Sequence, residues 1–196
     1  MKTIEETFAE YLKEFKTNIV KAVLGTFEQD KGIQPVVFGL VIHENKPALA
    51  VLQGLAELFD SDEGKEQAAR IIREASTTIK PLALCFVSEG WISEKAFSDY
   101  ESMVDKDGNY REGVIRPADD PNRKEIIMML FETHDKEAFV HFEMMRDGEE
   151  VTLQERLNVD WEPKKGNVKG RFMNLLGENY TELAQSIKTN LANSQN

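Results

Sequence analysis

Histidine and carboxylate side chains in the second half of the chain could hold a metal ion. His141 and Glu143 are two residues apart in a stretch with strand-like alternation, so their side chains share one face. His134 precedes them across a predicted turn, and imidazole and carboxylate groups are common zinc ligands. One hypothesis is therefore a small metal-assisted hydrolase that uses His134, His141 and Glu143. We favour the alternative that these are ordinary surface or turn residues, and we expect no cofactor.

A second polar set lies around an irregular stretch, residues 93–122, which is rich in turn formers. Ser88, Glu89 and Trp91 precede this stretch at the end of an apolar run. The other members are Arg116, Asp119, Asp120, Arg123 and Glu125. If the flanking strands are neighbours, these side chains form either a polar pocket walled by Trp91 or an ion-pair network that anchors the irregular stretch. We favour anchoring, because pairs of Arg with a carboxylate are common structural ties.

The usual catalytic nucleophiles are not supported by their surroundings. A serine on a nucleophile elbow needs glycine two residues before it, and Phe86 stands there before Ser88. Cys85 lies within the apolar run "LALCFV", which predicts a buried and unreactive thiol. The chain also contains no glycine-rich phosphate loop of the G-x-x-x-x-G-K-[ST] or G-x-G-x-x-G type.

The first element that would position these groups is an amphipathic helix at the N-terminus. Apolar residues recur at three- and four-residue spacing from Ile4 to Val23, Thr3 and Glu6 have the spacing of a capping box, and Gly25 is the predicted end. The apolar stripe is expected to pack on the domain's own sheet. The alternative is that it forms a homodimer with the same helix of a second copy.

Next come elements that predict a buried core. The stretch 34–55 reads as two strands around residues 44–46, and its apolar residues are so continuous that we expect a buried hairpin. A second helix begins at Ser61 or Asp62 and stops before Pro81, and residues 82–87 then form an interior strand.

The second half predicts an antiparallel meander of three strands between residues 124 and 157, with a tight turn at Asp147–Gly148. That turn would place Phe142 opposite Leu153 and Met144 opposite Val151. A terminal helix around residues 183–191 and a frayed tail at 193–196 follow. The whole chain, residues 1–196, is thus expected to be a single α+β domain. Its mainly antiparallel sheet of about five to six strands would pack with N-terminal, middle and C-terminal helices.

Composition narrows the functional classes. A net charge of −11 makes nucleic-acid binding unfavourable, no apolar stretch is long enough to span a membrane, and the chain has one cysteine. The N-terminus lacks the apolar core of a signal peptide, so we expect a cytoplasmic protein.

The stretches "SEGW" and "DPNRKEIIMM" resemble small uncharacterised reading frames of bacteria and their phages, a resemblance that implies no activity. The function we favour is a protein-binding or accessory and regulatory module with a protein partner, in a phage-type setting.

Overall fold

A computed structural model describes residues 3–44, 46–93, 111, 113–115, 119–164, 172 and 174–176. Most of the irregular stretch 93–122, the expected C-terminal helix and the tail at 193–196 lie outside these residues. In chain order the elements are α1 (Ile4–Asp30), β1 (Val36–His43), β2 (Lys46–Leu52), the 3-10 helix η1 (Ala56–Asp60), α2 (Asp62–Ile79), β3 (Ala83–Ile92), β4 (Lys124–Glu132), β5 (Lys136–Asp147) and β6 (Glu150–Pro163). The predicted single α+β domain is confirmed.

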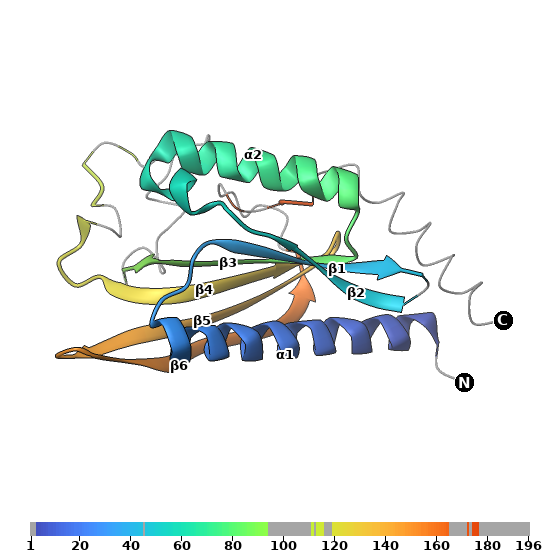
Figure 1. The fold of residues 1–196 in the computed structure, drawn as a ribbon, viewed down its shortest axis with the longest axis horizontal. Coiled ribbons are helices and arrows are strands. Elements are labelled where there is room, and N and C mark those ends of the chain that lie inside the picture. The colour runs from blue at the N-terminus through green and yellow to red at the C-terminus, as the bar shows by residue number, and fades with distance from the viewer. Residues whose placement is uncertain are drawn as a thin grey trace.

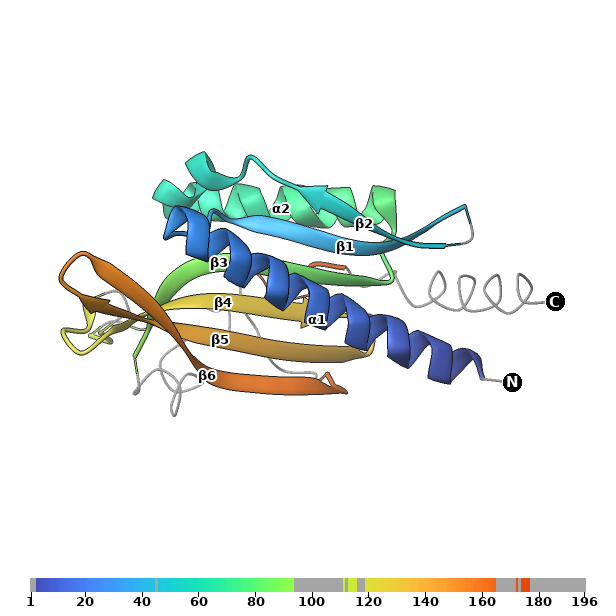
Figure 2. The same ribbon diagram turned by 60° about the horizontal axis from the view of Figure 1, so that its bottom comes forward.

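The sheet has the strand order β2-β1-β3-β4-β5-β6, and every neighbouring pair is antiparallel. The helix α1 covers one face and α2 covers the other, so the domain has three layers (Figures 1 and 2). Because β3 lies between β1 and β4, with a helix above and below it, both of its faces are buried. This explains why the run around Cys85 and Phe86 is apolar without alternation.

The core under α1 is formed by its apolar stripe and the odd-numbered residues of β3 and β4. Phe15 of the helix packs edge-on against Phe131 of β4, with ring centroids 6.0 Å apart. Trp161 of β6 packs against the same core, and its Nε1–H donates to the carbonyl of Leu12, at 3.3 Å. The stripe of the first helix is therefore used within the chain, as expected.

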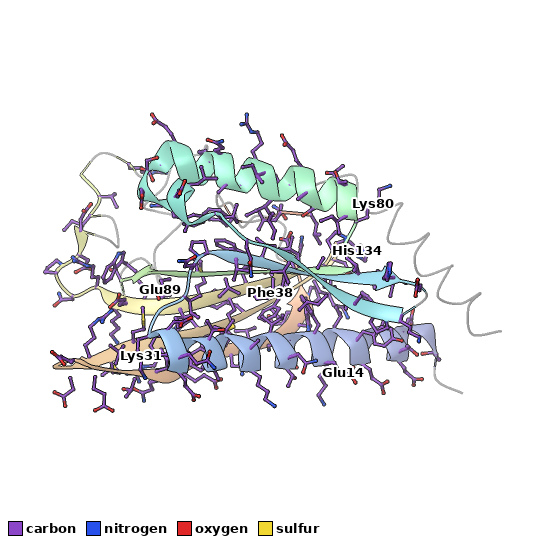
Figure 3. All side chains as sticks on the ribbon, viewed as in Figure 1. Glu14, Lys31, Phe38, Lys80, Glu89 and His134 are labelled. Atoms are coloured by element: carbon purple, nitrogen blue, oxygen red, sulfur yellow. The ribbon has the colours of Figure 1, made fainter. Side chains whose placement is uncertain are left out.

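The core under α2 is smaller and rich in aromatic rings. Phe86 of β3 stacks on Phe172 with centroids 4.4 Å apart, and Phe59 of η1 stacks on Phe172 at 5.3 Å. Ile72 of α2 is fully buried in this cluster, together with Leu175. Figure 3 shows side chains filling the layers between the sheet and both helices.

The predicted end of the first helix was wrong. α1 continues through Gly25 to Asp30 and ends where Lys31 adopts a left-handed conformation with φ 55°. The reason is Phe27, which extends the apolar stripe by one more turn and is buried in the core. The capping box of Thr3 and Glu6 at the other end is confirmed, with hydrogen bonds of 3.1 and 2.7 Å.

The predicted register between β5 and β6 was also wrong, by two residues. Asp147 pairs with Glu150, so the turn residues are Gly148 and Glu149, and Met144 faces Leu153. Gly148 has φ 62°, the positive value that a two-residue hairpin turn requires at its first central position. A shift of two residues keeps each side chain on its predicted face, because the strand period is two.

The expectation of a buried hairpin holds for β1 but not for β2. β2 is an edge strand of the sheet, and the side chains of Leu49 and Val51 are 53% and 47% exposed. Both residues pair with buried or half-buried residues of β1, Leu40 and Phe38. β2 is therefore an apolar strand that is open to solvent, although its neighbour β1 is largely buried.

Within the described residues, no helix is both long enough and apolar enough to cross a membrane.

Two glycines at helical positions have opposite surroundings and give a matched test of the fold. A Cβ at Gly25 would meet nothing within 4 Å, whereas one at Gly64 would lie 2.2 Å from the carbonyl oxygen of Leu58. Gly25→Ala should therefore raise the free energy of unfolding by about 0.5–1 kcal/mol, because alanine loses less entropy in a helix. Gly64→Ala should lower it by about 1–3 kcal/mol through overpacking. Urea denaturation of both variants measures this, and equal effects would contradict the described packing.

Candidate functional site

Part of the polar set predicted around the irregular stretch, namely Trp91, Asp120, Arg123 and Glu125, lies where β3 ends and β4 begins. Trp91 pairs with Glu125 across the two strands, and the guanidinium carbon of Arg123 lies 4.7 Å from the centroid of the Trp91 ring. Ser93 donates its hydroxyl to Asp120, at 2.6 Å, and Asp120 also accepts from the backbone N–H of Asn122, at 2.8 Å. These contacts tie the ends of the stretch to the sheet.

Two further members of that set have separate surroundings. Glu89 accepts a hydrogen bond from the backbone N–H of Ile33, at 2.5 Å, and so fixes the loop that follows α1. Ser88 is buried and projects from β3 on the opposite side from Glu89, because neighbouring strand residues alternate. Asp119 is exposed, and Arg116 lies outside the described residues. The contacts of this set are therefore structural: Arg123 contacts Trp91, Asp120 bonds Ser93, and Glu89 bonds the backbone of Ile33.

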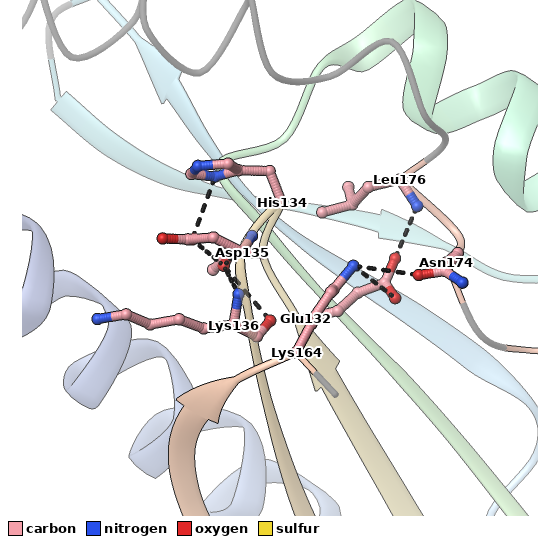
Figure 4. A network of polar contacts seen from close by, with 8 residues as sticks. Glu132, His134, Asp135, Lys136, Lys164, Asn174 and Leu176 are labelled. Carbon is pink, nitrogen blue, oxygen red and sulfur yellow. Dashed lines mark hydrogen bonds and ion pairs between the residues drawn. The ribbon is translucent and has the colours of Figure 1, made fainter. Parts of the chain in front are cut away.

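The residues of the metal hypothesis are not gathered in one place. His134 lies in the β4–β5 turn, where its Nδ1 is 3.3 Å from a carboxylate oxygen of Asp135, while His141 is in the middle of β5 (Figure 4 shows the turn). The five positions from Lys136 to His141 span about 16 Å of strand. Within the part of the chain that the structure describes, no three His, Cys, Asp or Glu residues are placed to hold a metal ion.

His141 and Glu143 nonetheless belong to a polar cluster on β5 and its neighbours. Glu143 accepts from Nε of Arg156 at 2.6 Å, and Nζ of Lys124 is 3.7 Å from the same carboxylate oxygen. Burial lowers the pKa of His141; Arg156 and Lys124 lower it further, while Glu143 opposes them. Among the described residues, Nδ1 of His141 has no hydrogen-bond partner. The cluster thus holds an imidazole of lowered pKa near a carboxylate that is paired with Arg156 and Lys124.

A buried carboxylate at the far end of β4 organises another polar network, drawn in Figure 4. Glu132 is 2% exposed, accepts from the backbone N–H of Leu176 at 2.6 Å, and lies 3.7 Å from Nζ of Lys164. Burial raises the pKa of Glu132, and Lys164 and the backbone N–H groups partly oppose the shift. Glu132 therefore joins two segments distant in the sequence, with the end of β6 on one side and residues 174–176 on the other.

Two adjoining hollows lie beside α1, over the β1–β2 hairpin. One hollow of about 470 Å³ lies between the middle of α1 and the hairpin. It is lined chiefly by Tyr11, Phe15, Ile19, Ala22, Leu40 and Leu49. A second hollow, of about 660 Å³, adjoins it at Ala22 and continues toward the end of α1, past Phe38 to Asp30 and Glu89. Figure 2 shows why they exist: α1 crosses the sheet diagonally and leaves β1 and β2 beside it.

We call this region the β2 surface: the exposed side chains of Leu49 and Val51 and the hollow lined by Tyr11, Phe15, Ile19, Ala22 and Leu40. Sequence reasoning missed it, because the apolar run of residues 47–52 reads equally well as an interior strand. One signal was present. β2 carries a single charged residue, Lys46, in a chain with a net charge of −11.

No family model, no curated protein and no solved structure matches this chain.

The contact between Glu89 and Ile33 predicts a stability effect. Glu89→Ala should lower the free energy of unfolding by about 1–3 kcal/mol, because the N–H of the buried Ile33 loses its acceptor. Glu89→Gln retains an acceptor oxygen and should cost less. Arg123→Ala removes an exposed cation–π contact and should cost about 0.5–1 kcal/mol. Urea denaturation ranks the three variants, and a neutral Glu89→Ala would contradict the anchoring interpretation.

The raised pKa of Glu132 predicts how stability varies with pH. The folded chain holds this proton more tightly than the unfolded chain, so the contribution of Glu132 to stability falls as pH rises above its ordinary value of 4.5. Glu132→Gln cannot titrate. The difference in unfolding free energy, variant minus wild type, should therefore increase from about pH 4 to about pH 8. Denaturation at a series of pH values measures it, and a flat or falling difference would show that burial does not dominate.

Proposed function

We propose that this chain is a protein-binding module that takes its partner on the β2 surface. The observation that carries the proposal is the exposure of Leu49 and Val51 on an edge strand, next to an apolar hollow of about 470 Å³. Edge strands of folded proteins are usually blunted by charges, bulges or covering segments, because their free backbone groups invite pairing. Among the residues that the structure describes along this edge, Lys46 and Pro47 provide such protection, and the rest of β2 is apolar.

The backbone of β2 supports the same conclusion. A proline in a sheet is confined to positions whose N–H side faces away from the neighbouring strand. Pro47 pairs with Ile42 of β1, so its nitrogen points outward, and so do the backbone groups of Leu49 and Val51 by alternation. The outer edge of β2 therefore offers two N–H donors and three carbonyl acceptors to an added strand, a recurring mode of recognition.

An accessory or regulatory role, a phage-type setting and a cytoplasmic location are part of this proposal. They rest on the acidic composition, the single cysteine and the resemblance of the "SEGW" and "DPNRKEIIMM" stretches. Burial raises the pKa of the Cys85 thiol well above its usual range, and such a thiol is inert.

Site-specific photo-crosslinking tests the proposal. A benzophenone-bearing phenylalanine in place of Leu49 should form adducts with a protein partner in extracts of cells that express the chain. The same group in place of Met145 on β5, which is 43% exposed and belongs to a strand remote from β2, is the matched control and should not. Val51→Lys, combined with the label at position 49, should abolish the adduct, because it puts a charge in the same apolar row. Adducts that are absent from position 49, or equal at both positions, would contradict the proposal.

A further inference from the structure

We infer that the occupant of the β2 surface is a second copy of this chain, with the two β2 strands paired antiparallel about a two-fold axis at Leu49. The inference rests on the proposed function, since it names the partner of the same surface. The dimer runs through the strand edge and not through the stripe of α1, which is buried against its own sheet.

The hydrogen bonds of such a pair are self-complementary. With Leu49 on the axis, the two Leu49 residues face each other and exchange two N–H···O bonds, because their backbone groups point outward. Val51 of each copy then faces Pro47 of the other. Val51 donates its N–H to the carbonyl of Pro47, and the missing N–H of proline costs each end only one bond. In this register the carbonyl of Pro47 accepts one hydrogen bond, while the carbonyl of Val51 receives none from the proline.

The side chains match in the same register. Leu49 and Val51 share the α1 face of β2, since they pair with Leu40 and Phe38 of that face. Rotation about an axis perpendicular to the sheet keeps this face on one side, so the row Pro47, Leu49, Val51 of one copy meets the row Val51, Leu49, Pro47 of the other. On the opposite face Ala48 meets Ala50. Half-exposed leucine and valine side chains thus cover one another, and small residues face small residues.

The charged residues at the two ends of β2 are compatible with a second copy in this position. Lys46 of one copy faces Leu52 of the other, the end of β2 from which the acidic turn η1 follows with Glu57 and Asp60. η1 packs on the face of the sheet that carries the side chain of Leu52. The side chain of Lys46 is on the same face, because the two residues are separated by an even number of positions along the strand. Lys46 of each copy therefore lies on the face and at the strand end from which the acidic η1 of the other copy continues, and no two like charges of β2 are opposed.

The size of the contact sets its strength. Stable complexes bury about 1,200–2,000 Å² in total, and two seven-residue strands lie at or below the lower end of that range. The dimer is therefore reversible, and its population depends on protein concentration.

Disulfide trapping tests the register. Residues that face each other in a hydrogen-bonded antiparallel pair have Cα atoms about 5.5 Å apart, which is within disulfide reach. The only native cysteine, Cys85, is fully buried, so it does not compete. Under mild oxidation Leu49→Cys should give a covalent dimer. Met145→Cys, 43% exposed on β5 and remote from β2, should stay monomeric.

Sedimentation analysis of the unmodified chain should show a mass that rises from monomer to dimer with concentration. Val51→Lys should weaken the association about tenfold or more, while Met145→Lys on β5 should leave it unchanged. If the wild-type chain stays monomeric and the Leu49→Cys variant does not form a covalent dimer, the inference that a second copy occupies the β2 surface is wrong. In that case photo-crosslinked adducts of position 49 with a different protein would preserve the proposed function, and their absence would remove both.

Discussion

The width of the sheet relative to a single helix is the constraint on which this structure depends. Six strands spaced about 4.8 Å apart span roughly 24 Å, whereas a helix with its side chains is about 10–12 Å wide. Each face has one described long helix, so neither α1 nor α2 covers all the strands of its face. α1 is placed over β3, β4 and β5, where Val87, Met129 and Val140 are completely buried. The strands left beside it on that face are β1 and β2.

The parts of the fold that depend on local chemistry could be read from the sequence. The capping box of Thr3 and Glu6, the start of the second helix at Ser61 or Asp62 and the buried run around Cys85 each carry their signal within a few residues, and all three are confirmed. The end of α1 could not be read, because Gly25 is a plausible helix terminus until Phe27 is known to have a place in the core. Similarly, the Asp147–Gly148 pair predicted a hairpin correctly, but the register of β5 against β6 depends on which of their apolar residues face each other.

The candidate site depends on contacts between distant segments, and the sequence contains little of that information. β1 and β2 are similarly apolar, yet only the insertion of β3 beside β1 decides that β2 is the edge. Glu89 meets Ile33 and Glu132 meets Leu176 across 56 and 44 positions. Conversely, His134 and His141 are close in the sequence but are held apart by the strand between them. Residue type and spacing predicted groups capable of chemistry, while the topology determined which of them are neighbours.

The acidity of the chain and the neutrality of β2 act together on association. A net charge of −11 opposes contact between two copies over most of the surface and so suppresses nonspecific pairing. β2 lacks that protection beyond Lys46, and its apolar row would be an aggregation hazard if it could pair in many registers. Pro47 removes one donor from the edge, which penalises registers that need an N–H at that position. Repulsion elsewhere and a proline at the edge therefore leave few ways for this strand to be covered, and a symmetric pair centred on Leu49 loses only one hydrogen bond at each end.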